Sequence, residues 1–333
     1  MLKVAMVGCG TMGRSHAYNL SRMPEVEFVG IYDAQHELAE KVAAEYGAAA
    51  FASFDEMIGT ADPDLVCVTL PTYLHKEYVL RTAEYGKHVF CEKPIAPTVE
   101  DAAEMMQFCE SKGVKLFVGH VVRFFPEYAD MKKHIDSGAI GRIGVVHTKR
   151  IGSHPGQARA WYKNASLSGG VIMDLMIHDI DYLRSVLGKA VSVYAVQKTS
   201  ESLDYALVTL RFANGAIANL EASWGYPGPF TTAAEFAGSE GVIRFNSEQA
   251  KSLKIAKTVI DEQGEHAVSV PKSPTMFDPY YLELKHFIEC IQTGAEPIVS
   301  AADACAALAI SLAAAESART GKPVALQPAE GGL

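Results

Sequence analysis

The sequence predicts an α/β protein in two parts: an N-terminal doubly wound parallel sheet, and a C-terminal α+β part with a large, mostly antiparallel open sheet. Three observations predict this fold. Residues 1–120 alternate short, continuously apolar strands with amphipathic helices, which is typical of a parallel sheet covered on both faces. A glycine-rich turn follows the first strand directly. Residues 121–333 contain longer strand-like runs and the hairpin dipeptide Asn214-Gly215.

Five strands and four helices are predicted in the first part. Each strand is a short apolar run, and each helix has the apolar spacing that buries one face. The helices stop at proline or glycine residues, as helices commonly do. The predicted strands are residues 4–7, 26–32, 65–69, 88–90 and 116–118, and the predicted helices are residues 12–23, 37–46, 74–85 and 99–111.

The second part is predicted to be α+β, with most of its strands paired antiparallel. Asn214-Gly215 separates two strand-like runs and predicts a two-residue hairpin turn between them. The boundary is expected near residue 120, which gives domains of residues 1–120 and 121–333. The predicted strands are 145–150, 191–196, 206–212, 216–220, 233–236, 242–245, 253–255 and 267–270, and the predicted helices are 277–292 and 301–320.

Composition narrows the classes of function. The 333 residues carry a formal net charge of -9, and nucleic-acid binding needs clustered Lys and Arg, so nucleic acid is not an expected partner. No stretch of roughly 18 apolar residues occurs, so a membrane partner is not expected either. The apolar start of the chain passes directly into a glycine turn, which indicates a buried strand and not a signal peptide.

The six cysteines are scattered along the chain, with no Cys-x-x-Cys pair. This spacing argues against a zinc site and against a redox pair. Small buried thiols of a reducing compartment are the simplest interpretation, so a cytoplasmic location is expected.

A glycine-rich loop, Gly8-Cys9-Gly10-Thr11-Met12-Gly13, joins the first strand to the first helix. In this context Gly-x-Gly-x-x-Gly is the dinucleotide-binding pattern of the Rossmann fold. Gly8 permits the tight turn, Gly10 lets a pyrophosphate approach the backbone, and Gly13 lets helix and strand pack closely. The N–H groups of the helix N-terminus then hold the anion. The alternative is a glycine turn that binds no ligand.

Asp33 ends the second strand, twenty residues after Gly13. Its carboxylate can accept hydrogen bonds from the hydroxyls of an adenosine ribose, and it would repel a 2′-phosphate. No Arg or Lys follows in Ala34-Gln35-His36. NAD is therefore favoured over NADP.

The tripeptide Glu92-Lys93-Pro94 follows the strand at residues 88–90 directly. Because ligands bind at the carboxyl ends of parallel strands, Lys93 is expected to point towards a bound nicotinamide. Its ammonium could stabilise negative charge on a substrate oxygen. A cis Lys93–Pro94 bond would fix this turn. The alternative is an exposed turn with a solvated lysine.

A second polar cluster follows Gly169-Gly170, where two glycines precede an apolar-periodic run. Asp174 and His178 are four residues apart and are expected on one helix face, with Asp181 one turn later. A carboxylate that orients an imidazole is a common arrangement for a general base. A structural histidine with an aspartate partner is an equal alternative. A metal site is a weaker one, because no second histidine lies nearby.

Together these motifs resemble the Gfo/Idh/MocA oxidoreductase family, which includes glucose–fructose oxidoreductase and inositol dehydrogenase. The resemblance covers essentially the whole chain. The segment Gly138-x-Ile140-Gly141-Arg142-Ile143-Gly144 also looks like the family's connection into the large sheet. The other carriers are the loop at residues 8–13, the segment Gly86-Lys87-His88-Val89-Phe90-Cys91-Glu92-Lys93-Pro94, and Ser168-Gly169-Gly170 leading into Asp174-x-x-x-His178-Asp179-x-Asp181.

The resemblance implies a dehydrogenase that oxidises a CH–OH group of a sugar or inositol with NAD(P). The substrate hydroxyl would lie between Lys93, which stabilises the alkoxide, and His178, which takes the proton as hydride leaves for the nicotinamide. Asp174 would orient His178. For His75 a capping or packing role is the alternative to a cofactor contact. The implied cofactor contacts are Gly8, Gly10, Thr11, Met12, Gly13, Asp33, Pro71, Thr72, His75 and Glu92.

Four further residues are candidate substrate contacts, because charged donors and aromatic faces hold sugars: Arg123, Arg150, Trp161 and Tyr162. Each could equally be structural. Family members of the inositol dehydrogenase type often carry Asn before the matching Arg, where this chain has Val122. This departure argues against a specific inositol assignment. The loop at residues 152–167 is expected to set specificity.

Other functions stay open at this point. A non-catalytic NAD-sensing protein could keep the fold, a sugar oxidoreductase could hold NAD(P) tightly and recycle it, and a metal-dependent hydrolase or lyase could use the second polar cluster. The open sheet needs cover on its outer face. As in the family, a homo-oligomer, either dimer or tetramer, is therefore expected.

Overall fold

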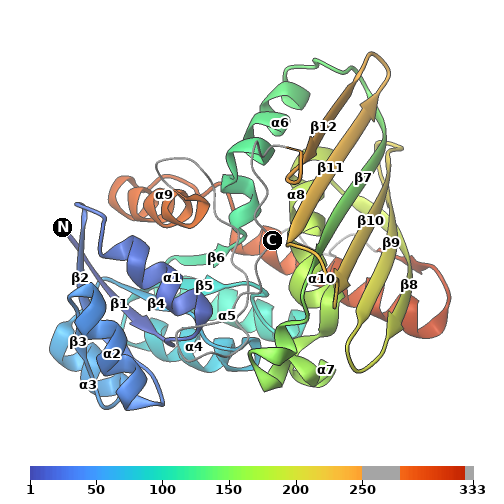
Figure 1. Ribbon diagram of the computed structural model, residues 1–333. Helices are drawn as coiled ribbons and strands as arrows, with labels where there is room; N and C mark the ends of the chain where they lie inside the picture. The colour runs from blue at the N-terminus through green and yellow to red at the C-terminus, as the bar shows by residue number, and fades with distance from the viewer. Residues whose placement is uncertain (250–277, 327–333) are drawn as a thin grey trace. The chain divides into compact units, whose positions relative to one another are not determined.

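The computed structural model describes residues 1–249 and 278–326 (Figure 1). Contacts within the chain define two compact units. Unit 1 contains residues 1–124 and 273–305, and unit 2 contains residues 125–272 and 306–333, each within the described residues. The strands predicted at 253–255 and 267–270, and the first residue of the helix predicted at 277–292, lie outside the described residues.

Unit 1 is built on a six-stranded sheet in the order β3-β2-β1-β4-β5-β6, and every neighbouring pair is parallel. The strand order reverses between β1 and β4, and open α/β sheets bind ligands at such a reversal, outside the carboxyl ends of the strands. The predicted doubly wound sheet is confirmed. Its strands are β1 (Leu2–Val7), β2 (Val26–Tyr32), β3 (Ala49–Ala50), β4 (Leu65–Val68), β5 (His88–Glu92) and β6 (Leu116–Gly119).

Five α-helices connect these strands. The four predicted helices are present, and a fifth, α3, was not predicted. Its signal is in the sequence, because the Ser53 side chain accepts a hydrogen bond from the Glu56 N–H as an N-cap. The two-residue strand β3 is too short to leave a pattern. The helices are α1 (Thr11–Leu20), α2 (His36–Tyr46), α3 (Phe54–Ala61), α4 (His75–Glu84) and α5 (Val99–Ser111).

A helix from the end of the chain, α9 (Pro279–Thr293), belongs to unit 1. Its Phe287 ring stacks on Phe117 of β6 with ring centroids 4.7 Å apart, and it also contacts Phe90 of β5. Aromatic pairs at this separation add to the stability that burial provides. Unit 1 is therefore made of two separate stretches of the sequence, whereas the predicted single boundary near residue 120 gives only one.

Unit 2 is built on a seven-stranded sheet in the order β12-β11-β7-β10-β9-β8-β13. The β7–β10 pair is parallel and the other pairs are antiparallel, so the predicted mostly antiparallel sheet is confirmed. The strands are β7 (Ile143–Gly152), β8 (Ala190–Thr199), β9 (Asp204–Phe212), β10 (Ile217–Trp224), β11 (Thr231–Gly238), β12 (Val242–Asn246) and β13 (Val324–Ala325).

The predicted hairpin at Asn214-Gly215 joins β9 to β10, but its loop is longer than expected. The Phe212 N–H donates to the Ala216 carbonyl, which leaves three residues between them. Gly215 has φ +89°, a conformation that favours glycine. Three-residue hairpins of this kind are the next most common after two-residue turns.

One face of the second sheet is buried beneath helices. Every second residue of β9 is buried, the period expected of a sheet covered on one side. The Tyr182 ring of α8 meets Phe236 of β11, and the Ser317 hydroxyl of α10 accepts a hydrogen bond from the Ala195 N–H of β8. The helices of this part of the chain are α6 (Pro126–Asp136), α7 (Ala165–Ser168), α8 (Ile177–Leu187) and α10 (Ala301–Thr320).

Helix α10 is long and apolar enough to cross a membrane by length and composition, with 20 residues and a mean hydropathy of 1.3. Core helices of globular proteins share these properties. Ala307, Leu308 and Ala314 of α10 are fully buried. Buried positions make up 39% of its most apolar stretch.

All six cysteines are free thiols, and all except Cys305 are buried. Burial raises the pKa of Cys9 and of Cys109 to about 12, so these thiols stay protonated near neutral pH. Their behaviour is that of the small buried hydrophobes that the sequence predicted.

Candidate active site

The glycine loop has the three backbone features that a dinucleotide site needs. Gly8 has φ +97°, so it makes the tight turn after β1. A Cβ on Gly13 would collide with the Gly8 carbonyl, so only glycine allows this contact between helix and loop. A Cβ on Gly10 would meet no atom within 4 Å, so the backbone there faces open space. A pyrophosphate fits such a loop.

The N-terminus of α1 is suited to an anion. Its first turn contains no acidic residue, and no described side chain caps it. By contrast, the four other helices that connect strands of this sheet each carry Asp or Glu in the first turn. A carboxylate at a helix N-terminus occupies the place that a phosphate would take. The difference favours α1 as the helix that holds the pyrophosphate.

Asp33 is fixed at the carboxyl end of β2. One carboxylate oxygen accepts the Cys9 N–H at 2.7 Å, and the other accepts the Gln35 N–H at 2.8 Å. The first bond ties Asp33 to the glycine loop itself. Both bonds use one lone pair of their oxygen, and a carboxylate oxygen can accept more than one hydrogen bond. The carboxylate therefore keeps acceptor capacity for a ribose hydroxyl.

The residues after β4 follow the carboxyl end of the next strand. Pro71 is partly exposed, and Thr72 is buried at the start of a short 3-10 helix, Thr72–Leu74. His75 is fully buried, with Nδ1 2.8 Å from the Pro94 carbonyl and Nε2 2.8 Å from the Leu70 carbonyl. Burial lowers the pKa of His75. This geometry favours the packing role for His75, bracing two loops, over direct contact with a cofactor.

Lys93 lies directly after β5, and the Lys93–Pro94 bond is cis, as predicted. From residue 89 to residue 96, Lys93 is the one side chain that is not buried. Lys93 is therefore the one accessible side chain among buried neighbours at the carboxyl end of this strand. This arrangement favours a functional lysine over a freely solvated one.

Glu92, expected near the cofactor, makes buried contacts inside unit 1. It is 6% exposed, and its Oε1 lies 2.6 Å from Nε2 of His16, a residue of α1 that is itself fully buried. Its Oε2 accepts the Lys93 N–H at 3.2 Å. Burial alone would raise the pKa of Glu92, but the hydrogen bond from His16 and the nearby charges of His16 and Lys93 hold it below its usual value. Glu92 is thus a buried carboxylate.

In unit 2, a pair of glycines opens the segment that carries Asp174 and His178. Gly169 and Gly170 have φ +72° and +69°. A Cβ on Gly170 would come 2.8 Å from Asp204 Oδ2, and the same oxygen accepts the Val171 N–H at 2.8 Å. Asp204 therefore anchors the start of the segment, a role that the sequence did not indicate.

The predicted α-helix through Asp174 is wrong in detail. Residues Ile172–Met176 form a π-helix, and α8 begins at Ile177. A π-helical turn has i→i+5 hydrogen bonds, so a four-residue spacing there does not place two side chains directly above one another. Single π-turns are frequent at functional sites.

Asp174 and His178 are nevertheless distinguished from their surroundings. From Gly170 to Leu183, they are the two side chains that are not buried. The neighbouring apolar residues Ile177, Ile180 and Leu183 are fully buried. Asp181 is fully buried as well, so it does not share their access to solvent. The segment holds one carboxylate and one imidazole at an accessible surface.

Two of the predicted substrate contacts form ion pairs. Arg150 donates to both carboxylate oxygens of Asp179, at 2.8 and 3.1 Å, and both side chains are buried. Arg123 donates to the Ile298 carbonyl at 2.8 Å and to Asp303 at 3.2 Å. These contacts favour the structural alternative for both arginines.

The two predicted aromatic contacts lie in one cluster within unit 2. Trp161 stacks on Tyr162 with centroids 3.9 Å apart, and Tyr162 meets Trp224 edge-on. His154 packs on the same Trp224 ring at 5.4 Å. Trp161 and Tyr162 are partly exposed, whereas Trp224 is buried. Trp224 therefore supports a platform of the kind that a sugar ring can stack on.

Comparison with known proteins decides the family. Residues 2–120 match the sequence profile described as "Oxidoreductase family, NAD-binding Rossmann fold", and residues 132–326 match "Oxidoreductase family, C-terminal alpha/beta domain". The chain belongs to the Gfo/Idh/MocA oxidoreductase family. The predicted resemblance, the oxidoreductase class and NAD as cofactor are therefore confirmed.

Several relatives of this Gfo/Idh/MocA protein match over nearly their whole length. The scyllo-inositol 2-dehydrogenase (NAD(+)) of Bacillus subtilis is 32% identical, over 98% of this chain and 96% of its own. A myo-inositol dehydrogenase structure from Corynebacterium glutamicum superimposes with a TM-score of 0.83 at 27% identity, over 99% of this chain and 100% of its own. A levoglucosan dehydrogenase in complex with NADH and L-sorbose superimposes with a TM-score of 0.84 at 27% identity, over 98% and 99%.

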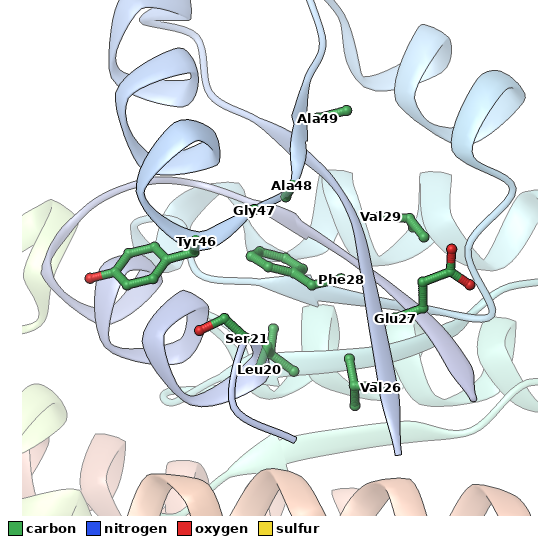
Figure 2. A pocket seen from close by; sticks show the side chains of 10 residues that line it. All are labelled: Leu20, Ser21, Val26, Glu27, Phe28, Val29, Tyr46, Gly47, Ala48 and Ala49. Carbon is green, nitrogen blue, oxygen red and sulfur yellow. The ribbon is translucent and has the colours of Figure 1, made fainter. Parts of the chain in front are cut away.

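A surface hollow of about 360 Å³ lies away from the family's motifs (Figure 2). It is bordered by the C-terminal ends of α1 and α2 and by the first half of β2, and it contains none of the predicted site residues. The ligand crevice of a parallel sheet lies at the opposite, carboxyl ends of the strands. Its lining residues are Leu20, Ser21, Val26, Glu27, Phe28, Val29, Tyr46, Gly47, Ala48 and Ala49.

Within residues 1–249 and 278–326, no group of three or more His, Cys, Asp or Glu side chains is arranged to hold a metal ion. The glycine motif lies within the residues that match the NAD-binding profile. Sequence reasoning missed two residues: His16, beside Glu92 in unit 1, and Asp204, at the start of the Asp174 segment in unit 2.

Proposed function

We propose that this protein is an NAD-dependent dehydrogenase that oxidises a secondary hydroxyl of a sugar or cyclitol. The observation behind the proposal is that three polar side chains, Lys93, Asp174 and His178, are partly exposed to solvent in segments whose other residues are buried. Dehydrogenases of inositols and of levoglucosan among the relatives support this substrate class.

The glycine loop, the N-terminus of α1 and Asp33 would hold NAD. When bound, NAD supplies a hydride acceptor at C4 of its nicotinamide. The N–H groups of the first turn of α1 would hold the pyrophosphate, since no carboxylate in that turn competes for them. Asp33 accepts from the ribose hydroxyls, and its charge disfavours a 2′-phosphate.

Lys93 and His178 have different roles towards the substrate hydroxyl. The Lys93 ammonium donates to the hydroxyl oxygen and stabilises the negative charge that develops there. Neutral His178 accepts the hydroxyl proton, and in the reverse reaction it returns that proton to the carbonyl oxygen. Asp174 stabilises the imidazolium that His178 becomes. The proposal requires both groups to reach the same hydroxyl.

Turnover with a panel of inositols, aldoses and their keto forms tests this function. Reduced cofactor is followed by absorbance, with NAD and NADP in parallel. We expect turnover of at least one polyol, with NAD preferred. A protein that binds NAD but oxidises or reduces none of them would be a sensor. Retention of NAD through gel filtration, with no exchange of added NAD, would indicate a tightly bound cofactor that is recycled.

Replacing Asp33 by alanine is expected to weaken NAD binding about 10-fold or more, because a charge-assisted hydrogen bond to the ribose contributes roughly 1.5–3 kcal/mol. Calorimetric titration with NAD measures the change. Asp64→Ala is a matched control, because Asp64 also accepts a backbone N–H, that of Lys3, at 2.8 Å. Equal NAD affinity in Asp33→Ala and the native protein would contradict the role of Asp33.

We also propose a cytoplasmic homo-oligomer, a dimer or tetramer, assembled through the outer face of the second sheet. Large apolar side chains are exposed there, and monomers seldom leave such a face uncovered. Val196 and Leu207 lie opposite one another on β8 and β9, and each is more than 40% exposed. The other large apolar residues exposed on strands of this sheet are Val145 of β7, Tyr194 of β8, Ile217 of β10 and Val242 of β12.

A double change, Val196→Lys with Leu207→Lys, is expected to dissociate the oligomer, because burying two lysines without partners is costly. Light scattering after gel filtration measures the mass. Ile298→Lys is the control, since Ile298 is an equally exposed residue of unit 1. A native protein that elutes as a monomer would contradict the proposed assembly.

A further inference from the structure

The buried pair of His16 and Glu92 is the strongest feature of unit 1 that the proposed chemistry does not use. Nε2 of His16 lies 2.6 Å from Glu92 Oε1, and the two side chains are 0% and 8% exposed. An imidazole and a carboxylate can both carry a charge, and burying a charge is costly unless it is paired and hydrogen-bonded. The pair joins α1, the helix behind the glycine loop, to the strand end that carries Lys93.

The direction of this hydrogen bond follows from the chemistry of its partners. Glu92 is ionised, because its hydrogen bond and its neighbours hold its pKa below the usual value despite burial. A carboxylate only accepts, so His16 Nε2 carries the proton and donates it. His16 Nδ1 has no hydrogen-bond partner within the described residues. Edge contacts with Phe90 and Tyr280 fix the ring on its other sides.

The other Glu92 oxygen acts on Lys93 directly. Oε2 accepts the Lys93 N–H at 3.2 Å, and the charges of Glu92 and Lys93 attract each other. Close packing holds the carboxylate in place, since a Cβ on Gly119 of β6 would come 3.4 Å from Glu92 Oε2. The titratable groups around Glu92 are His16 from α1, His75 from α4, Lys93, and the thiols Cys67 and Cys91.

We infer that His16 and Glu92 are positioning residues for Lys93. His16 holds the Glu92 carboxylate in place inside unit 1, and Glu92 in turn fixes the Lys93 backbone at the end of β5 and sets a negative charge beside it. The inference rests on the proposed function for its kinetic consequence. Its electrostatic consequence belongs to unit 1 alone and is measurable without substrate.

The experiment compares Glu92→Gln, His16→Leu and their double variant with the native protein. Acetic anhydride labelling as a function of pH, read by mass spectrometry of the peptide that contains residue 93, gives the midpoint pH at which Lys93 becomes reactive. We expect this midpoint to fall in each single variant, because the negative charge that attracts the Lys93 ammonium is removed or neutralised. The double variant should match the single variants, because both single changes act through the negative charge of Glu92: Glu92→Gln removes it, and His16→Leu removes the donor that stabilises it.

Two controls separate positioning from folding. His16→Gln keeps a donor for Glu92 and should restore the native midpoint. Asn19→Ala removes a buried hydrogen bond one turn further along α1, from Asn19 to Asp278, and should leave the Lys93 midpoint unchanged. If His16→Leu does not fold, Glu92→Gln and His16→Gln still decide the question.

The pH profile of kcat/KM supplies the second readout, on a polyol that the native enzyme oxidises. Its alkaline limb should move to lower pH in step with the labelling midpoint. A native labelling midpoint in folded Glu92→Gln would overturn the inference. A native protein that oxidises no polyol would overturn the proposed function instead, while the labelling result would still decide the role of the pair.

Discussion

Alanine in place of Lys93 or of His178 is expected to lower kcat by about 10²-fold or more, with NAD affinity nearly unchanged. Lys93→Ala removes the cation that stabilises the developing alkoxide, and His178→Ala removes the group that accepts the proton. Neither side chain belongs to the glycine loop or to the Asp33 region that would hold the nucleotide. Steady-state rates with a substrate found in the polyol screen, together with calorimetric titration with NAD, measure both quantities.

Surface variants of the same residue types are the controls for this prediction. Lys132 pairs with Asp136 on the exposed side of α6, and His134 on the same helix is well exposed. Lys132→Ala and His134→Ala should keep native rates. Native kcat in either Lys93→Ala or His178→Ala would show that the affected side chain has no part in the chemical step.

Methionine in place of Arg150 is expected to lower the free energy of unfolding by about 3–5 kcal/mol, because it leaves the Asp179 carboxylate buried without its cation. Both side chains of this pair are almost inaccessible, at 4% and 1% exposed. Urea unfolding followed by tryptophan fluorescence measures the change. The two tryptophans, Trp161 and Trp224, both lie in unit 2, as does the ion pair.

A double variant and a surface variant test this explanation. Arg150→Met with Asp179→Leu should recover most of the lost stability, since replacing a whole buried pair by apolar groups is often neutral. Lys132→Met, which breaks a half-exposed pair, should cost less than about 1 kcal/mol. If Arg150 instead binds substrate, Arg150→Met would raise KM and leave the unfolding transition where it is in the native protein.

The sequence predicted the fold of unit 1 well because its signals are local. Continuous apolar runs, glycine helix ends and the spacing of Gly8, Gly10 and Gly13 each depend on neighbours along the chain. The strand predicted at residues 26–32 coincides with β2. The return of α9 to the first sheet depends on packing between Phe287 and Phe117, which are far apart in sequence, and no local pattern encodes it.

The candidate site shows the same division. Lys93, Asp174 and His178 were predicted from motifs, and each is accessible in a buried frame. The π-helix at Ile172–Met176 escaped prediction because its residues keep the apolar composition of an ordinary helix. The His16–Glu92 bond joins residues 76 positions apart. The predicted substrate role of Arg150 could not be weighed until its partner Asp179 was known.

The most direct test of the central claim is a crystal structure of the protein with NADH and the polyol that gives the highest turnover. We expect one substrate hydroxyl within about 3 Å of both Lys93 Nζ and a ring nitrogen of His178, beside the nicotinamide. A bound polyol whose hydroxyls neither group reaches, directly or through one water, would contradict it.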